Sequence, residues 1–162
     1  PNKGSTFWIE ISLAPQKTQS DVLPLQRKKA QIHHQNHLVL YIEDNAANLR
    51  VVEAMFQHMP HLKLISAPRG EFGLELARRY KPDIILLDIH LPGIDGYAVL
   101  EALKTNPITC DIPVFALSAD AMTVDIERGL RAGFVKYLTK PVKMNVLQDA
   151  IGSYLNGTDL NA

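Results

Sequence analysis

Five short apolar segments alternate with five stretches of helical periodicity between residues 38 and 155, and this alternation constrains the fold most strongly. The apolar segments are LVLYI (38–42), LKLIS (62–66), DIILLD (83–88), VFALS (114–118) and VKYLT (135–139). The helical stretches cover about residues 46–58, 71–80, 97–105, 121–131 and 143–155. Regular alternation is typical of parallel strands joined by right-handed crossover helices. The sequence therefore predicts an α/β fold, a doubly wound five-stranded parallel sheet with helices on both faces.

Apolar side chains recur at helical spacing in the first and last helical stretches. The stripe of the first stretch consists of Leu49, Val52, Phe56 and Met59. The stripe of the last consists of Val146, Leu147, Ala150, Ile151, Tyr154 and Leu155. Asp95 is placed to cap the third helix, and Gly133 is placed to end the fourth. We expect both stripes to pack against the sheet.

Length, charge and cysteine content limit the possible classes of protein. The 162 residues suffice for one domain of ordinary size plus additional segments. Lys+Arg and Asp+Glu number 17 each, and the resulting zero formal charge argues against non-specific nucleic-acid binding. A single cysteine, Cys110, excludes an internal disulfide and suits a reducing cytoplasm. No apolar run approaches the roughly 20 residues of a membrane span. The chain begins at Pro1 rather than Met, so we expect a fragment of a longer protein.

Polar side chains follow several of the predicted strands. They are Glu43, Asp44, Asp88, Ser118 and Lys140. In a doubly wound sheet the functional crevice lies outside the carboxyl ends of the strands, so these side chains should converge. Three crowded carboxylates raise one another's pKa values unless a cation neutralises them. An acid-rich set of oxygen ligands suits Mg²⁺, which needs only one or two carboxylates.

Each of these residues also has a purely structural interpretation. Asp88, the pair Glu43–Asp44 and Ser118 could cap the elements that follow them, and Lys140 could be a solvated surface lysine. A capping role for each residue separately does not readily explain why all of them fall at the same edge of one sheet. The convergence therefore favours a functional site.

Four segments resemble the receiver domain of bacterial two-component response regulators: YIEDNAANLRVV, DIILLDIHLPGIDGYAVL, PVFALSADA and AGFVKYLTKPV. The resemblance spans about residues 38–156, with the segments in the same order and spacing. It implies the flavodoxin-like strand order 2-1-3-4-5. It also implies that Asp88 accepts a phosphoryl group from a phosphohistidine. Glu43 and Asp44 match the acidic pair that holds Mg²⁺, with Asp44 as a direct ligand. Asp88 and the backbone carbonyl of His90 are the other expected ligands, and Lys140 would neutralise the phosphoryl oxygens.

The resemblance further implies a conformational switch. Ser118 would donate a hydrogen bond to the phosphoryl group, and Tyr137 matches the switch aromatic that would then turn inward. The peptide bond Lys140–Pro141 is expected to be cis. His90 and Asp120 occupy positions that tune the dephosphorylation rate in the family. Because His90 departs from the commoner residues at its position, the lifetime of the phosphoryl group stays open.

The first segment, PNKGSTFWIEISLA, resembles the last strands of the ATP-binding domain of a sensor histidine kinase. We therefore expect a kinase remnant at 1–14, a linker at 15–37, a receiver domain at 38–156 and a tail at 157–162. This is the order found in hybrid histidine kinases. The nucleotide-binding boxes of a kinase are absent from the sequence, so the fragment is not expected to be a kinase by itself. The parent chain would be a histidine protein kinase, a transferase.

The sequence thus predicts a phosphoacceptor receiver domain of a two-component phosphorelay with Mg²⁺ as its cofactor. The expected partner is the phosphohistidine donor domain of a histidine kinase or a histidine phosphotransfer domain, without nucleic acid and without membrane contact. We expect a cytoplasmic location, even where the parent kinase is anchored in a membrane. Two alternatives stay open. One is an Mg²⁺-dependent phosphatase with an aspartate nucleophile, which would need a second acid where His90 stands. The other is a non-phosphorylated interaction receiver, which would have lost Asp88, Lys140 or a member of the acidic pair.

Overall fold

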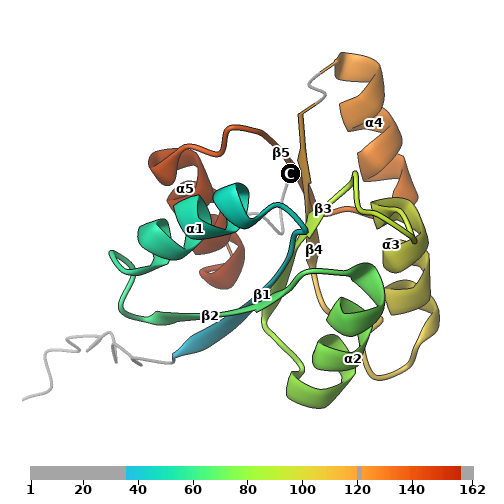
Figure 1. Cartoon of the computed structure of the whole chain (residues 1–162), viewed down its shortest axis with the longest axis horizontal. Helices are drawn as coiled ribbons and strands as arrows, with labels where there is room; N and C mark the ends of the chain where they lie inside the picture. Colours follow the sequence, from blue (N-terminus) through green and yellow to red (C-terminus); the bar gives the residue numbers. More distant parts are fainter. Residues whose placement is uncertain (1–35, 120–121, 158–162) are drawn as a thin grey trace, which may run out of the picture. The chain divides into compact units, whose positions relative to one another are not determined.

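The computed structural model describes residues 36–119 and 122–157, which form a five-stranded parallel sheet flanked by five helices (Figure 1). The strands are β1 (His37–Ile42), β2 (Leu62–Ala67), β3 (Ile84–Asp88), β4 (Val114–Ser118) and β5 (Lys136–Thr139). The helices are α1 (Ala46–Phe56), α2 (Gly70–Tyr80), α3 (Gly96–Thr105), α4 (Thr123–Ala132) and α5 (Met144–Leu155). The strand order is β2-β1-β3-β4-β5, with every neighbouring pair parallel. The predicted fold is confirmed.

Some sequence-based expectations fall on residues that the structure does not describe. The kinase remnant at 1–14 lies outside the described residues, as does Asp120. The same holds for the linker at 15–37 apart from its last two residues, of which His37 begins β1. Within 36–119 and 122–157, none of the helices is both long enough and apolar enough to cross a bilayer.

The helices form two layers around the sheet. Helices α1 and α5 cover one face, and α2, α3 and α4 lie on the other (Figure 1). Each face has its own apolar cluster: Tyr41, Phe56 and Leu147 belong to the first, and Ile42 and Leu103 to the second. Because β3 and β4 are buried on both faces, their sequences are nearly continuous apolar runs. Asp88 and Ser118 are therefore buried polar residues at the ends of two otherwise apolar strands.

Local signals in the sequence predict most helix ends but not every buried face. The Asp95 carboxylate accepts from the Ala98 N–H at 2.8 Å and caps α3, and Gly133 ends α4 with a φ of 111°. Helix α4 begins at Thr123, later than the predicted residue 121. The placement of Val146 on the buried stripe of α5 is wrong, because this side chain is 42% exposed while Leu147 next to it is buried. Successive helical residues point about 100° apart, so only one of two neighbours can face the sheet squarely.

The strand order creates a crevice between β1 and β3. These strands are neighbours, but the chain leaves β1 toward α1 on one face and β3 toward α3 on the other (Figure 1). Such a point, where successive connections go to opposite faces, is where ligands bind in open α/β sheets. Ile42 pairs with Leu87, so the residues that follow them, Glu43 and Asp88, stand level at this edge.

Candidate functional site

Three carboxylates meet at the carboxyl ends of β1 and β3. One oxygen from each of Glu43, Asp44 and Asp88 lies within 4.8 Å of the others. Glu43 and Asp88 are 1% and 5% exposed, whereas Asp44 is exposed. They line a cleft of about 300 Å³ together with Asn45, Asn48, His90, Ala119 and Lys140. The predicted convergence of acids is therefore present in the structure.

Lys140 places a positive charge between the two buried acids. Its Nζ lies 2.6 Å from Glu43 Oε2 and 2.8 Å from Asp88 Oδ2. The residue follows β5, where its backbone N–H donates to the Ser118 carbonyl at 2.7 Å. The Lys140–Pro141 peptide bond is cis. Since the lysine side chain is only 15% exposed, it is not a solvated surface lysine.

The two buried acids differ in their pKa values. Burial raises the pKa of Asp88, and this effect outweighs the hydrogen bonds that the carboxylate accepts from Lys140 and from the His90 N–H at 3.1 Å. Burial also acts on Glu43, but its hydrogen bonds to Lys140, Tyr41 and Asn48 prevail and lower its pKa. Neighbouring carboxylates whose environments separate their pKa values can take different chemical roles. Glu43 is the firmly ionised acid, and Asp88 is the more basic one.

Sequence reasoning missed two side chains that hold Glu43. The Tyr41 hydroxyl donates to Glu43 Oε2 at 2.5 Å, and the Asn48 amide donates to Oε1 at 3.0 Å. Burial, and then the bond to Glu43, raises the pKa of Tyr41, so its hydroxyl keeps the proton that it donates. A signal for Tyr41 exists in the alternation of a strand, which directs residues 41 and 43 to the same face. Asn48 has the weaker signal of lying near the start of a helix.

The structural interpretation of the strand-end residues accounts for little of the arrangement. The cap residues of α1, α3 and α4 are Asn45, Asp95 and Met122. Asp88 and Ser118 therefore do not cap the helices that follow them. Glu43 has a partial role of this kind, because its Oε1 accepts from the Asn45 N–H at 3.2 Å.

The residues predicted to form a switch lie at the end of β4 and in β5. Ser118 is fully buried at the end of β4, next to Ala119, which lines the cleft. Tyr137 is half-buried in β5 and packs against the cluster beneath α2 and α3. Its ring lies close to α4, because a Cβ added to Gly129 would be 2.8 Å from Tyr137 Cδ2. The two residues thus lie in neighbouring strands, with Tyr137 against α4.

The acidic residues fit a hard divalent cation. Glu43, Asp44 and Asp88 offer oxygen ligands only, which suits Mg²⁺ or Ca²⁺ better than a soft metal. The exposed Asp44 faces a cleft that has room for metal-bound waters. His90 lines the same cleft.

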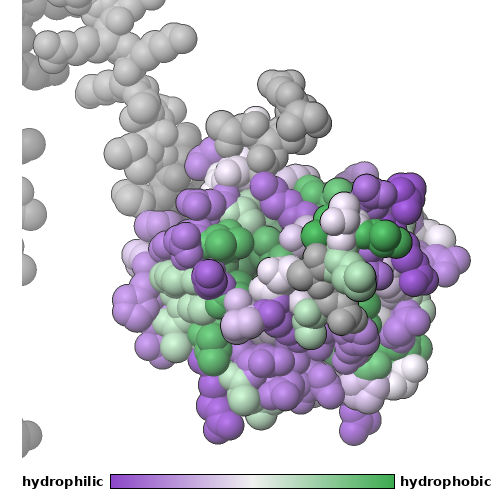
Figure 2. All heavy atoms as spheres, turned by 90° about the horizontal axis from the view of Figure 1, so that it is seen from above, coloured by the Kyte–Doolittle hydropathy of each residue, from purple (hydrophilic) through white to green (hydrophobic). Residues whose placement is uncertain are grey.

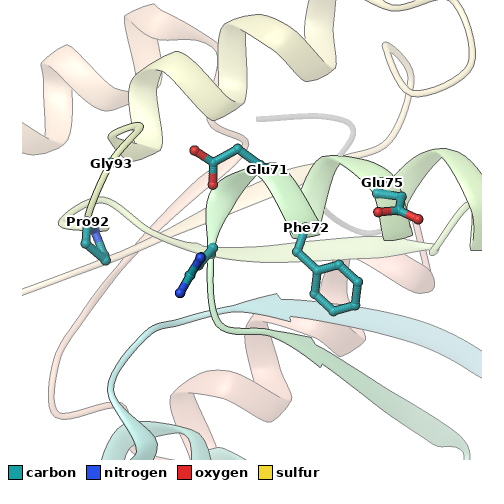
Figure 3. Close-up of a pocket in the computed structure, with 6 residues that line it drawn as sticks. Glu71, Phe72, Glu75, Pro92 and Gly93 are labelled. Atoms are coloured by element: carbon teal, nitrogen blue, oxygen red, sulfur yellow. The ribbon is translucent and has the colours of Figure 1, made fainter.

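A second cleft lies between the start of α2 and the β3–α3 loop. It has a volume of about 680 Å³ and is lined by Arg69, Glu71, Phe72, Glu75, Pro92 and Gly93. Figure 3 shows Glu71 beside Gly93, and Glu75 further along the same helix. The residues predicted to act chemically do not line this cleft.

Figure 2 shows a largely hydrophilic face of the molecule with separate hydrophobic patches.

The chain is similar in sequence and in fold to known proteins of one family. Residues 39–152 match the family described as response regulator receiver domain. The polar-differentiation response regulator DivK of Brucella anthropi is 35% identical over 117 residues, which is 72% of this chain and 94% of DivK. Protein PilH of Pseudomonas aeruginosa is 33% identical over 119 residues, 74% of this chain and 98% of PilH. A similar solved structure is the receiver domain of the sensor histidine kinase PA1611 from Pseudomonas aeruginosa, which has a magnesium ion coordinated in its active-site cleft. Its TM-score is 0.69 at 31% identity, and the match covers 75% of this chain and 98% of that domain.

Proposed function

The chain belongs to the response regulator receiver domain family, and from this premise we propose that Asp88 accepts a phosphoryl group from a phosphohistidine. The observation that carries the proposal is the environment of the Asp88 carboxylate. This group is buried at the edge of the cleft, with Lys140 Nζ 2.8 Å from Oδ2 and the His90 N–H 3.1 Å from Oδ1. Both oxygens are therefore oriented by donors. The raised pKa of Asp88 makes this carboxylate the better nucleophile of the two buried acids.

The reaction is a displacement at phosphorus. A carboxylate oxygen of Asp88 forms a bond to phosphorus while the bond from phosphorus to the donor histidine nitrogen breaks. The nitrogen keeps the electron pair of the broken bond. A proton already on the other ring nitrogen of the donor, or taken from water as the bond breaks, makes the departing group a neutral imidazole rather than an imidazolate. Phosphoryl transfer depends mainly on positioning and on neutralising charge, because the phosphoryl oxygens carry the charge of the transition state. The Lys140 ammonium, already in contact with Asp88, would interact with one of those oxygens.

Asp44, Asp88 and the backbone carbonyl of His90 would hold Mg²⁺, which would neutralise charge on the phosphoryl oxygens when bound. The fit rests on the carboxylate oxygens of Glu43, Asp44 and Asp88, which lie within 4.8 Å of one another. Asp44 is the exposed member and can turn toward an ion without losing core contacts. Glu43 is engaged by Tyr41, Asn48 and Lys140, so its contribution is a fixed negative charge behind the site.

The phosphoryl group would act on the surface through Ser118 and Tyr137. A hydroxyl at the end of β4 can follow a new phosphoryl group on Asp88, because Asp88 pairs with Leu117, the residue before Ser118. Tyr137 in the adjacent strand packs near Gly129 of α4. A charge added at the cleft would thereby bias the position of an aromatic side chain at the α4–β5 surface.

The phosphatase alternative is less well supported. An aspartate-dependent phosphatase needs a second acid two residues after its nucleophile to protonate the leaving group. His90 stands at that position here. The interaction-only alternative is disfavoured because Asp88, Lys140, Glu43 and Asp44 are all present and close together.

A hybrid histidine kinase is the proposed parent of the chain. The resemblance of residues 1–14 to the end of a histidine kinase ATP-binding domain, ahead of a receiver domain, supports this origin. The similarity to the PA1611 receiver domain, which comes from a sensor histidine kinase, is consistent with it. The proposed partners are the phosphohistidine domain of that kinase or a histidine phosphotransfer domain.

The proposal is tested by intact mass spectrometry after incubation with acetyl phosphate and Mg²⁺. The wild-type chain should gain the mass of one phosphoryl group, and Asp88→Asn should gain none. Asp111→Asn, which changes an exposed aspartate away from the cleft, should behave as the wild type. Labelling of Asp88→Asn, or labelling that persists after Mg²⁺ is chelated, would contradict the proposal.

A further inference from the structure

Tyr41 brings a hydroxyl group into an otherwise apolar layer next to the site. Its side chain is 1% exposed and belongs to the cluster between the sheet and helices α1 and α5. A buried hydroxyl requires a hydrogen-bond partner, since leaving it without one is costly. The partner is the carboxylate of Glu43, two residues further along the same strand face. The apolar ring thus has a polar end that touches the acidic cluster.

Four donors surround the Glu43 carboxylate. Tyr41 and Lys140 donate to Oε2 at 2.5 and 2.6 Å, and Asn48 and the Asn45 N–H donate to Oε1 at 3.0 and 3.2 Å. An ionised carboxylate has about four lone-pair sites. The hydrogen-bonding capacity of Glu43 is therefore filled by groups from β1, the start of α1 and the loop after β5. This arrangement fixes the carboxylate in one orientation.

A chain of contacts leads from Tyr41 to Asp88. Tyr41 and Lys140 share one oxygen of Glu43, and the Lys140 ammonium reaches on to Asp88 Oδ2 at 2.8 Å. A cavity of about 60 Å³ lies beside Lys140, with Tyr41 among the residues that line it. This volume exceeds the roughly 10–15 Å³ that one water requires, so the lysine has space into which it could withdraw. Its contact with the fixed Glu43 opposes such a movement.

We propose that Tyr41 is a positioning residue: its hydroxyl fixes Glu43, and the fixed Glu43 holds the Lys140 ammonium against Asp88. The inference rests on the proposed function in one respect, because Asp88 is taken as the phosphoacceptor. Tyr41 itself touches neither Asp88 nor the phosphoryl group. Its effect passes through two other side chains.

Removing the hydroxyl alone should weaken this arrangement. In Tyr41→Phe, Glu43 Oε2 loses one of its two donors while the ring still fills the core. The carboxylate then either draws Lys140 more fully to itself or rotates to find another donor. Both changes weaken the contact between the Lys140 ammonium and the Asp88 carboxylate. Because Asp44 and Asp88 are untouched, binding of Mg²⁺ should change little.

The experiment compares Tyr41→Phe with Tyr154→Phe, a half-buried tyrosine of the same apolar cluster that does not line the cleft. Two quantities are measured: the NMR signal of the Lys140 side-chain ammonium without Mg²⁺, and the rate of phosphorylation by acetyl phosphate with Mg²⁺. We expect Tyr41→Phe to shift or broaden the Lys140 signal and to slow phosphorylation about tenfold. The dissociation constant of Mg²⁺ should stay within about threefold of the wild type, and Tyr154→Phe should match the wild type within about twofold.

The two measurements separate this inference from the proposed function. If the wild type accepts no phosphoryl group, the proposed function fails, and the Lys140 signal alone decides whether Tyr41 positions the lysine. An unchanged Lys140 signal in Tyr41→Phe overturns the inference, and so does an unchanged rate in a chain that is otherwise phosphorylated. A double variant adds a second test, because Tyr41→Phe should have no further effect on the rate in a Glu43→Gln background. If Tyr41→Phe slows phosphorylation as much in the Glu43→Gln background as it does in the wild type, the inference is also overturned.

Discussion

The Lys140 ammonium lies 2.6 Å from Glu43 Oε2, although 97 residues of sequence separate the two side chains. The same ammonium lies 2.8 Å from Asp88 Oδ2, so one cation serves two buried carboxylates. The result is an unequal pair of acids. Glu43 has a lowered pKa and keeps its charge, while burial leaves Asp88 with a raised pKa. This inequality leads to predictions about stability as well as reactivity.

Asp88→Asn should stabilise the metal-free domain at neutral pH. Burial raises the pKa of Asp88 above its ordinary value of 3.8, so its ionised form opposes folding. A raised pKa contributes stability below the ordinary value, and this contribution is lost as the pH rises through the folded-state pKa. Urea unfolding with a chelator should therefore give the variant a higher midpoint at pH 7, and the difference should shrink near pH 3. A lower midpoint at pH 7 would indicate that the bond to Lys140 outweighs burial.

Saturating Mg²⁺ should make the wild type more stable than Asp88→Asn. A ligand that binds only the folded state at 100 times its dissociation constant adds about 2.7 kcal/mol to the free energy of unfolding. The wild type should gain this amount, whereas Asp88→Asn should gain much less because it lacks one proposed ligand. Unfolding midpoints over a Mg²⁺ titration measure both gains. Equal gains in the two chains would remove Asp88 from the set of ligands.

Glu43→Gln should destabilise the domain and make its free energy of unfolding depend less on pH in the acid range. The pKa of Glu43 is lowered, so its stabilising contribution is present above the ordinary value of 4.5 and is lost as the pH falls below it. Hydrogen bonds to charged groups are worth about 1.5–3 kcal/mol, which sets the expected loss at pH 7. The control is Glu127→Gln, because Glu127 forms an exposed pair with Arg131 at 3.3 Å. Such surface pairs contribute about 0–1 kcal/mol. A similar loss in both variants would contradict the buried role of Glu43.

Gly96→Ala should damage the site through the backbone of β3. A Cβ at this position would lie 2.6 Å from the Asp88 carbonyl oxygen and 2.7 Å from Ile89 Cα, and backbone atoms cannot move aside cheaply. Overpacking of this kind costs about 1–3 kcal/mol. At Gly152, in α5, a Cβ would meet nothing within 4 Å, so Gly152→Ala should stabilise the helix by roughly 0.5–1 kcal/mol. Thermal unfolding of the two variants should shift in opposite directions, and a shared direction would show that the contact at Gly96 relaxes.

Ser118→Ala should separate phosphorylation from the switch. The attack by Asp88 depends on Lys140 and the metal ligands, so the variant should still gain a phosphoryl group. The response of Tyr137 should be lost, because the hydroxyl that would follow the phosphoryl group is gone. Chemical shifts of the Tyr137 ring with Mg²⁺ and beryllium fluoride, a phosphoryl mimic, test this. Equal responses in the wild type and Ser118→Ala would mean that the signal takes another route.

The sequence predicts the sheet and most of the cleft because both depend on short-range patterns. Apolar runs such as residues 84–87 must be buried strands, and a parallel sheet places their carboxyl ends together. What the sequence does not reveal is pairing between side chains. Tyr41 looks like an ordinary core residue, because an apolar run does not indicate where a hydroxyl will find its acceptor. The exposure of Val146 is likewise decided by the rotation of α5 against the sheet, which periodicity defines only to within one residue.

The site also has a consequence for how the chain folds. Glu43 and Asp44 follow β1 and Asp88 ends β3, but the lysine follows β5, which pairs with β4 at one edge of the sheet that the described residues form. A chain emerging from a ribosome would thus assemble like charges before it could neutralise them, and such repulsion disfavours a half-built sheet. Because residues 43 and 140 are far apart in the sequence, their contact carries an entropic cost of loop closure that a local contact does not. Competence for phosphorylation should therefore appear only with the completed domain, so that an immature or truncated chain stays silent in signalling.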